Sequence, residues 1–239
     1  MRYIYGPVKS RRLGLSLGIS LTPQKFCSFD CIYCQFGGTT VKTGERREYI
    51  DIREVFEELR LWLENNVSQS AGLKYVTLSG SGEPTLNIKI GELITQIKKI
   101  TAIPVAVITN ASLLSDAAVR RQITQADLIA PSLDAATEAV FVKIDQPALG
   151  IKVEGIIDGL IKLRQEYRGQ IWLEVMLVAG INDDIRHIKK LKEAIDRINP
   201  DRVQLNSPIR SSAQLNLRLV SEVKLKKIKA LLGERCEII

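Results

Sequence analysis

The sequence predicts an α/β fold with a parallel central sheet, built as an open sheet or an incomplete barrel within one domain of residues 1–239. Short runs rich in Val, Ile and Leu alternate with longer amphipathic stretches, which is the pattern of repeated βα units. No linker rich in Pro, Gly or Ser and no repeat of about 20 to 50 residues divides the chain. Six units can be counted. The eightfold closed barrel takes about 250 residues and two more units, so the sheet is expected to stay open.

The first βα unit carries a long loop. Its strand is expected over Leu13–Leu21, and the loop that follows holds three cysteines. Asp51 has the side chain of a helix N-cap, and Glu54 stands at the spacing of a capping box. A helix is therefore expected from Asp51 to about Asn65. The apolar run Lys74–Leu78 has the length of a strand and ends at a polar turn, so it is expected to be the second strand.

The rest of the chain continues the alternation of helix and strand. Each expected helix is an amphipathic stretch, and each expected strand is a short aliphatic run. A loop at Gln146 and Pro147 interrupts the pattern once. The expected elements are a helix over Ile88–Ile100, a strand over Val105–Thr109, a helix over Ser115–Gln125, a strand over Leu128–Leu133, a helix over Val153–Tyr167, a strand over Ile171–Val178, a helix over Asp184–Ile198, a strand over Val203–Leu205 and a helix over Glu222–Leu232.

Polar residues and glycines follow the ends of the predicted strands. The cysteine loop follows the first strand, and a Ser-Gly-Ser-Gly-Glu-Pro turn follows the second. In parallel α/β folds the carboxyl ends of the strands meet on one face, where binding and catalytic sites form. The residues expected to share this face are Cys27, Cys31, Cys34, Gly80, Ser81, Gly82, Glu83, Asn110, Ser132, Asp134, Asn206 and Ser207.

The composition is that of an ordinary globular protein. Hydrophobic residues make up 45% and charged residues 26% of the chain, a balance that excludes disordered and collagen-like proteins. No apolar run reaches the roughly 18 residues of a membrane span, and the N-terminus lacks the apolar core of a secretion signal. We therefore expect a cytoplasmic protein with no membrane partner. The net charge of +7 permits an RNA partner, although basic residues on helices more often form a solvated face.

The cysteines are unevenly distributed. Cys27, Cys31 and Cys34 lie in one C-x3-C-x2-C loop. Cys236 is remote, and this pattern indicates metal binding or catalysis and not a disulfide framework. A structural zinc site needs four ligands, and the candidates for a fourth are Cys236 and His187, which is expected to face solvent from a helix. Three thiolates better suit a [4Fe–4S] cluster with one open iron, whereas a simple electron carrier would protect all four irons.

The cysteine loop and the glycine turn resemble the motifs of a known family. The loop has an aromatic residue, Tyr33, before its third cysteine, and Ser81-Gly82-Glu83-Pro84 resembles a Gly-Gly-Glu motif with serine as its first residue. Both are similar to signatures of the radical S-adenosylmethionine (SAM) superfamily, and the likeness covers most of the chain. The resemblance implies a partial (β/α)6 barrel. It also implies an iron–sulfur enzyme that cleaves SAM to a 5′-deoxyadenosyl radical, which takes hydrogen from a substrate.

The resemblance further implies a role for most residues of the site. Iron would be held by the three cysteines of the loop, and the remaining residues would contact SAM. In full, Cys27, Cys31 and Cys34 would ligate iron, Tyr33 would lie near the adenine, and Gly80, Ser81, Gly82 and Glu83 would receive the methionine end. From their places at the strand ends, and not from the resemblance, Asn110, Ser132 and Asp134 are expected to reach the ribose or the sulfonium.

Some of these residues also have simpler structural interpretations. Gly80 and Gly82 suit a tight turn that needs positive φ, and Glu83 suits the cap of the helix that follows it. Asp134 suits the N-cap of a helix that enters at Thr137. For these residues the structural and the functional interpretations are both open at the level of the sequence.

A finer likeness concerns the substrate. The segment from Tyr5 to Gly18 is similar to that of wyosine-synthase-like, tRNA-modifying radical SAM proteins, but the extra cysteines of a second cluster are lacking. We expect an RNA base as substrate and an external electron donor, with radical activation of a partner protein as the alternative. Arg11 and Arg12 are expected to pair with acidic surface groups more than to grip an anionic substrate. Outside this class, the alternatives are a zinc-binding structural module and an electron carrier.

Overall fold

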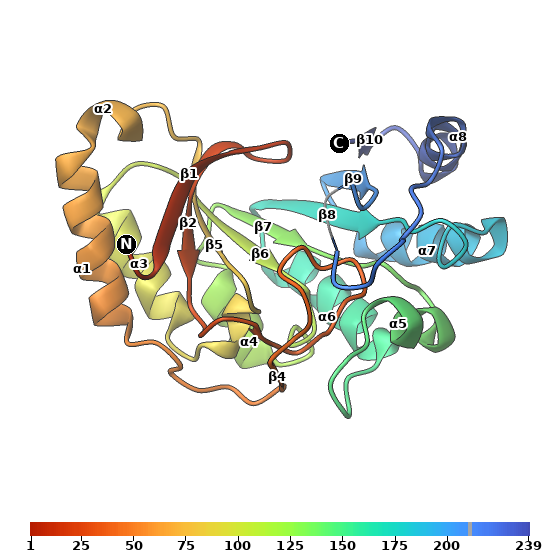
Figure 1. The fold of residues 1–239 in the computed structure, drawn as a ribbon, viewed down its shortest axis with the longest axis horizontal. Helices are drawn as coiled ribbons and strands as arrows, with labels where there is room; N and C mark the ends of the chain where they lie inside the picture. Colours follow the sequence, from red (N-terminus) through yellow and green to blue (C-terminus); the bar gives the residue numbers. More distant parts are fainter. Residues whose placement is uncertain (210–211) are drawn as a thin grey trace.

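Residues 1–209 and 212–239 are described by a computed structural model, which builds them around an eight-stranded sheet (Figure 1). In order across the sheet, the strands are β1 (Ile4–Ser10), β2 (Gly14–Ser20), β5 (Tyr75–Ser79), β6 (Val105–Thr109), β7 (Leu128–Pro131), β8 (Gln170–Met176), β9 (Arg202–Asn206) and β10 (Cys236–Ile238). Neighbouring strands are parallel except for the antiparallel pair β1 and β2. The predicted α/β class with a mostly parallel sheet is confirmed.

Helices surround the outer side of the sheet (Figure 1). They are α1 (Ile52–Asn65), α2 (Val67–Ser70), α3 (Ile90–Ile100), α4 (Ala117–Ile123), α5 (Glu138–Ile144), α6 (Val153–Glu166), α7 (Ile185–Ile198) and α8 (Glu222–Leu232). Each of the strands β2, β5, β6, β7, β8 and β9 is followed by at least one of these helices, so the six expected βα units are present. The predicted bounds of these elements agree with the observed ones to within two residues.

Helix α7 shows how the sequence pattern selects an element. Its N-terminus is capped by the Asp184 side chain, which accepts hydrogen bonds from two backbone N–H groups of the first turn. Its apolar residues recur at intervals of three and four and therefore share one face. Burial of each such side chain stabilises the fold by about 1.5 to 3 kcal/mol. The buried stripe consists of Ile188, Leu191, Ile195 and Ile198.

His187, in the same helix, does not face solvent as expected. It is 4% exposed, because its position lies four residues before Leu191 and so beside the buried stripe. Burial lowers the pKa of the imidazole, so His187 is neutral at physiological pH.

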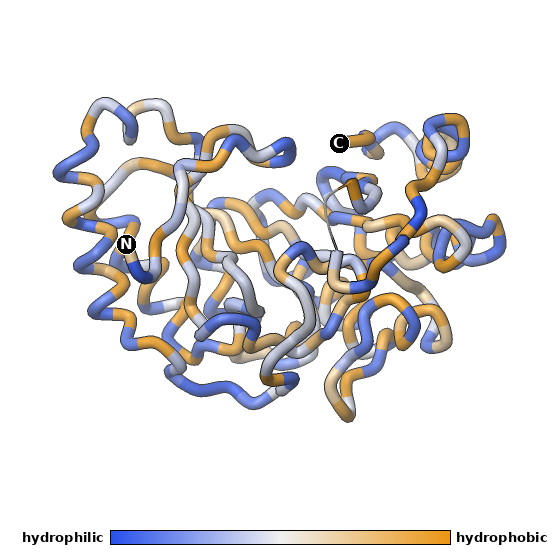
Figure 2. The backbone as a smooth tube through the Cα atoms, viewed as in Figure 1, coloured by the Kyte–Doolittle hydropathy of each residue, from blue (hydrophilic) through white to orange (hydrophobic). Residues whose placement is uncertain are grey.

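The hydrophobic core lies between the sheet and the helices. Figure 2 shows hydrophobic segments along the central strands, and mixed hydrophilic and hydrophobic residues along α1. Leu17 and Ile19 of β2 and Leu93 and Ile97 of α3 are fully buried. The core therefore joins the sheet to its helical cover and leaves the strand ends for other uses.

The two edges of the sheet, β1 and β10, are absent from the prediction. Gly6 and Pro7 interrupt the strand pattern of β1, and β10 has only three residues. In Figure 1 the hairpin of β1 and β2 points toward the C-terminal strand. Arg11 Nη1 at its tip donates to the carbonyl oxygen of Ile239 at 3.0 Å. A side-chain contact, and not further strand pairing, therefore joins the edges within the described chain.

Two details of the helices differ from the expectation. Asp51 does cap α1 by accepting from the N–H of Arg53 at 2.9 Å, but Glu54 does not complete a capping box, because its carboxylate accepts from the Tyr3 hydroxyl. Helix α5 was expected only as a helix that enters at Thr137, without an end, and the 3-10 turn η1 (Pro84–Leu86) was not predicted. Both are too short to show a helical repeat of apolar residues.

Candidate functional site

The cysteine loop is folded back on itself after β2. Its two-residue strands β3 (Phe26–Cys27) and β4 (Val41–Lys42) pair in parallel, and the Thr43 N–H donates to the Cys27 carbonyl at 3.0 Å. All three cysteines of the loop are free thiols of intermediate burial. They line one central cavity of about 360 Å³.

Two of the sulfur atoms accept hydrogen bonds. Lys25 is only 3% exposed, and its Nζ donates to Cys34 Sγ at 2.9 Å. Asn110 Nδ2 donates to Cys27 Sγ at 3.5 Å. Burial, with a contribution from the charge of Glu83, raises the pKa of Cys27 to about 12, so this thiol is protonated in the absence of metal. An ammonium and an amide aimed at sulfur suit thiolate ligands, because they stabilise the anionic form.

The donor set fits an iron–sulfur cluster better than zinc. Thiolates are the usual ligands of such clusters, and a closed zinc site would need a fourth ligand. Cys236 is buried in the hydrophobic core at β10, and His187 lies in α7; neither lines the cavity. Within residues 1–209 and 212–239, no group of three or more His, Cys, Asp or Glu side chains is arranged to hold a metal ion. The three thiols therefore border one cavity without converging on one point.

The turn after β5 packs directly against the cysteine loop. Gly80 has a φ of +103°, and a Cβ there would lie 2.6 Å from Ser20 Oγ. A Cβ on Gly82 would lie 2.0 Å from the carbonyl oxygen of Phe26. Positive φ in a tight turn therefore explains Gly80, whereas close approach of two backbone segments explains Gly82.

A buried hydroxyl beside Gly82 has no partner. Thr22 is 3% exposed, and its Oγ1 makes no hydrogen bond in the described parts of the chain. This atom lies 2.3 Å from the position of a Cβ on Gly82. Leaving such a group unsatisfied costs about 1 to 3 kcal/mol. The corner therefore suits a ligand with polar atoms, and the ammonium and carboxylate of SAM are of that kind.

Substitution of Gly82 by Ala is expected to destabilise the protein by about 1 to 3 kcal/mol, because the new methyl group meets backbone that cannot rotate away. Unfolding in urea measures the change. Gly155→Ala is the matched control, since nothing lies within 4 Å of a Cβ at that helical position and a gain of up to about 1 kcal/mol is expected. Equal effects of the two substitutions would contradict the close contact at Gly82.

The Glu83 carboxylate is buried and accepts four hydrogen bonds. The donors are the N–H and the hydroxyl of Thr85, at 3.0 and 2.6 Å, the Thr109 hydroxyl at 2.6 Å, and the Asn110 N–H at 2.8 Å. Glu83 therefore caps the 3-10 turn η1 and not the expected helix, whose N-cap is Lys89, and it also ties the turn to the end of β6. Burial raises its pKa against the effect of these donors. A direct contact of Glu83 with SAM stays a prediction.

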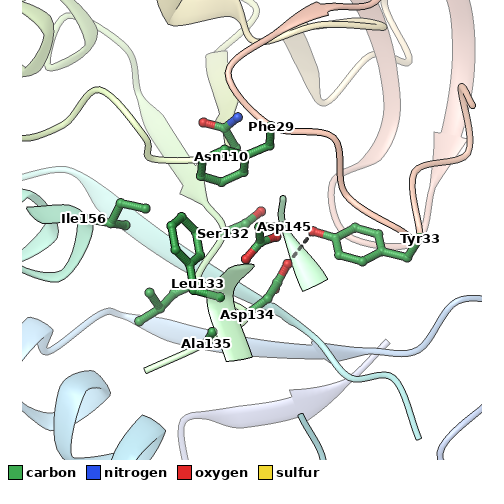
Figure 3. Close-up of a pocket in the computed structure, with 10 residues that line it drawn as sticks. Phe29, Tyr33, Asn110, Ser132, Leu133, Asp134, Ala135, Asp145 and Ile156 are labelled. Carbon is green, nitrogen blue, oxygen red and sulfur yellow. Dashed lines mark hydrogen bonds between the residues drawn. The ribbon is translucent and has the colours of Figure 1, made fainter. Parts of the chain in front are cut away.

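Asp134 and Tyr33 meet beside the cavity, and Figure 3 shows their side chains joined by a hydrogen bond. The Tyr33 hydroxyl donates to Asp134 Oδ2, and the Met176 N–H donates to Asp134 Oδ1 at 2.7 Å. Asp134 is not the N-cap of α5; that position belongs to Thr137, whose side chain makes no capping bond. Burial raises the pKa of Asp134 to about 7.

Asp145 is a second buried carboxylate, which was not predicted. It lies with Asp134 and Tyr33 in a small pocket next to the central cavity (Figure 3). The pocket has a volume of about 10 Å³, enough for about one water molecule. Cys31 Sγ donates to Asp145 Oδ1 at 3.4 Å, and the Asp30 N–H donates to the Asp145 carbonyl at 3.0 Å. Burial and the charge of Asp134 raise the pKa of Asp145. Two neighbouring buried carboxylates of this kind hold protons that exposed ones would lose.

Asp134→Asn is expected to change how stability depends on pH. The native carboxyl holds its proton up to about pH 7, whereas the unfolded one loses it near 3.8. Between these values the native state binds more protons, so the free energy of unfolding falls as pH rises, by up to about 1.4 kcal/mol per pH unit. Urea unfolding of the metal-free protein between pH 5 and 7 is expected to show a flatter slope for the variant.

Asp158→Asn, which removes an exposed carboxylate on α6, is the control for this substitution and should leave the slope as it is. A slope that is the same in the wild type and in Asp134→Asn would contradict the raised pKa.

The remaining predicted residues also reach the cavity. Asn110 Nδ2 donates to Ser28 Oγ at 2.9 Å, and Ser132 forms a single parallel bridge with Glu174. Asp134 is the exception and lies in the adjoining pocket. The predicted residues that line the central cavity are Cys27, Cys31, Cys34, Tyr33, Gly80, Ser81, Gly82, Glu83, Asn110, Ser132, Asn206 and Ser207.

Sequence reasoning missed Lys25, Thr22 and Asp145. Lys25 stands two positions before the first cysteine, which is the one signal that marks it in the sequence. Nothing in the sequence marks the other two, because their importance comes from an unpaired buried hydroxyl and from a contact across the fold.

Arg11 and Arg12 were expected to pair with acidic groups on the protein surface, and this prediction was wrong. Both line the central cavity, and among the described residues neither pairs with an exposed acidic side chain. Arg12 forms an ion pair with Glu174, whose side chain is 11% exposed. Arg11 Nη2 donates to Asn206 Oδ1 at 3.1 Å. The hairpin tip therefore brings both guanidinium groups to the wall of the central cavity.

The chain is similar in sequence to a known family and to curated proteins. The model of the family described as Radical SAM superfamily matches residues 21–201. A protein described as GTPase Obg from Brachyspira hyodysenteriae is 39% identical, and a UPF0026 protein from Methanocaldococcus jannaschii is 36% identical; each match covers 98% of this chain. The chain spans 34% of the length of the first relative and 72% of the second.

Solved structures share the fold. A radical SAM methyltransferase from Sphaerobacter thermophilus aligns with a TM-score of 0.69 and 16% identity, over 94% of this chain and 66% of that chain. Archaeal TYW1 aligns with a TM-score of 0.62 and 20% identity, over 92% of this chain and 72% of that chain. No helix in the described parts of the chain is long and apolar enough to cross a membrane.

Proposed function

The chain belongs to the radical SAM superfamily, and from that premise we propose that residues 1–239 act in the cytoplasm as one catalytic core that modifies a base of an RNA substrate. Enzymes of this superfamily use a [4Fe–4S] cluster and SAM, together with an electron donor. The observation that carries the proposal is the meeting of the cysteine loop and the glycine turn at one cavity of about 360 Å³. Both motifs and the space for a substrate then lie on one face.

Cys27, Cys31 and Cys34 would hold the cluster. When bound, the cluster and SAM supply the 5′-deoxyadenosyl radical that abstracts hydrogen from the substrate. The Lys25 ammonium and the Asn110 amide, which already donate to sulfur, would stabilise the thiolate form of the ligands. The protein's part is to hold these atoms in place and to keep water away from them.

The glycine turn would receive the methionine end of SAM. Gly82 lets the turn approach the cysteine loop, and Thr22 offers an unpaired hydroxyl at the same corner. Glu83 is held in one orientation by its four donors, so it positions the turn whether or not it touches the ligand. Tyr33 and Asp134 would border the adenosine side, where their hydrogen bond fixes both side chains.

Anaerobic reconstitution separates this function from its alternatives. We expect about four irons and about four sulfides per chain, and release of 5′-deoxyadenosine from SAM after reduction. A zinc-binding structural module would retain about one zinc per chain and cleave no SAM. An electron carrier would assemble a cluster with all its irons protected and would also leave SAM intact.

Charge supports RNA as the substrate. The net charge of +7 attracts a polyanion, and Arg11 brings part of that charge into the cavity. Binding of bulk tRNA, measured across a salt series, is expected to weaken steeply as salt rises, because phosphate contacts release counterions. Absence of binding at low salt would remove the RNA substrate and leave radical activation of a partner protein as the reaction to test.

A further inference from the structure

The lining of the central cavity carries more positive than negative charge. Its ionised groups of fixed sign are Arg11, Arg12 and Lys25 against Glu83 and Glu174. Both carboxylates are already occupied: the first by its four donors, the second by the ion pair with Arg12. The charged side chains that line the cavity therefore have a net positive charge, which lies at the end of the cavity next to the hairpin tip.

Arg11 accounts for this surplus at the hairpin tip. In residues 1–209 and 212–239 no Asp or Glu side chain forms an ion pair with it, and its two hydrogen bonds go to the side-chain amide oxygen of Asn206 and to a backbone oxygen of Ile239. A guanidinium has five N–H donors, so three are left for a ligand. The tip is held in shape because Ser10 Oγ accepts from the N–H groups of Arg12 and Leu13, both at 3.2 Å. The free donors are thus presented on a fixed support.

Flat apolar side chains border the same cavity. Tyr5 lies across β2, where the absence of a side chain on Gly18 makes room for its ring, and its hydroxyl hydrogen-bonds to Ser79 Oγ at 2.6 Å. Phe36 is 46% exposed and also lines the cavity. Tyr5 and Phe36 also border a second cavity of about 690 Å³, so each of them faces open space in both cavities. Aromatic surfaces of this kind stack on nucleobases.

We infer that Arg11 anchors the phosphate of a nucleotide whose base lies against Tyr5 and Phe36. The inference rests on the proposed function, because it names the part of the substrate that enters the cavity. An arginine fork recognises phosphate by parallel N–H···O bonds, and the aromatic wall supplies the contact for the base. The ligand of this site is therefore a nucleoside phosphate, which is either free in solution or part of an RNA strand.

Calorimetric titration of the loaded holoprotein with the common nucleoside 5′-monophosphates, and with the matching nucleosides, tests the anchor. At least one monophosphate is expected to bind about tenfold more tightly than its nucleoside. Arg11→Gln is expected to remove this advantage, and Arg11→Lys, which keeps the charge without the fork, to keep part of it. Lys9→Gln removes an exposed charge from β1, two positions before Arg11 and outside the cavity lining, and is expected to change nothing. No advantage of phosphate, or equal losses in Arg11→Gln and Lys9→Gln, would overturn the anchor.

Phe36→Leu tests the base contact. It is expected to weaken monophosphate and nucleoside by the same factor, of about tenfold, because both carry the base. Unchanged binding of both ligands would overturn the aromatic part of the inference.

Competition by tRNA distinguishes the two sources of nucleotide. If tRNA displaces the monophosphate, and if Arg11→Gln binds tRNA more weakly than Lys9→Gln does, the nucleotide belongs to an RNA strand. Monophosphate binding that tRNA leaves unchanged identifies the free nucleotide. The wild type also separates the two levels of inference: SAM cleavage without nucleotide binding overturns only the anchor, whereas nucleotide binding without SAM cleavage overturns only the proposed function.

Discussion

Substitution of Cys27, Cys31 or Cys34 by Ala is expected to abolish both iron loading and the release of 5′-deoxyadenosine. The three thiols are supplied by one loop and border one cavity, and each variant removes one of the three proposed ligands for the cluster. Anaerobic reconstitution, followed by iron and sulfide analysis and detection of 5′-deoxyadenosine, measures the loss. The circular dichroism of each variant is expected to stay that of the wild type, because no thiol of the loop is fully buried.

Cys236→Ala is the matched control for these variants. This thiol is 2% exposed in β10 and packs in the hydrophobic core, outside the cavity lining. Its removal is expected to cost about 1 kcal/mol of stability through a small cavity and to leave iron loading and cleavage at wild-type levels. Equal loss of activity in all four alanine variants would refute the assignment of three ligands.

Arg12→Met is expected to lower the free energy of unfolding by about 3 kcal/mol, because it leaves the Glu174 carboxylate buried without its cation. The side chains are 24% and 11% exposed, so solvent replaces the lost partner only in part. In the described parts of the chain, the carboxylate of Glu174 also accepts a hydrogen bond from Asn206 Nδ2 at 3.2 Å, which does not neutralise the charge. Urea unfolding of the metal-free protein gives the difference directly.

Glu174→Gln in the Arg12→Met background is expected to recover much of this stability, because the second substitution removes the uncompensated charge. Arg197→Met is the matched control, since its pair with Asp158 is 3.7 Å long and 62% exposed on both sides. Such a pair contributes at most about 1 kcal/mol. If Arg12→Met is no more harmful than Arg197→Met, the ion pair with Glu174 does not stabilise the fold as a buried pair should.

The elements that the sequence predicts well are those with a local physical cause. The stripe of α7 and the cap at Asp184 are visible in the sequence, and the structure has both. The missing strands β1 and β10 depend on pairing with partners, β2 and β9, that supply what their short or interrupted sequences lack. Residue patterns report burial along one element, whereas edge strands are stabilised by hydrogen bonds to another.

The candidate site divides in the same way. The cysteine spacing and the glycine turn are local, because a ligand set within one loop and a backbone without Cβ are written in consecutive residues. The roles of Lys25, Asp145 and Arg12 depend on residues far along the chain or on burial that composition does not reveal. Asp134 illustrates the limit, since its predicted cap was replaced by contacts with Tyr33 and the backbone of β8.

The sequence by itself therefore determined the α/β class, the six βα units and the motifs that identify a radical SAM protein, since periodicity and spacing are properties of neighbouring residues. Only the tertiary structure decided which charges enter the cavity and which polar groups are left without a partner. Those outcomes depend on how strand ends and a hairpin tip meet across the sheet, where distance, burial and competing partners select one contact among many.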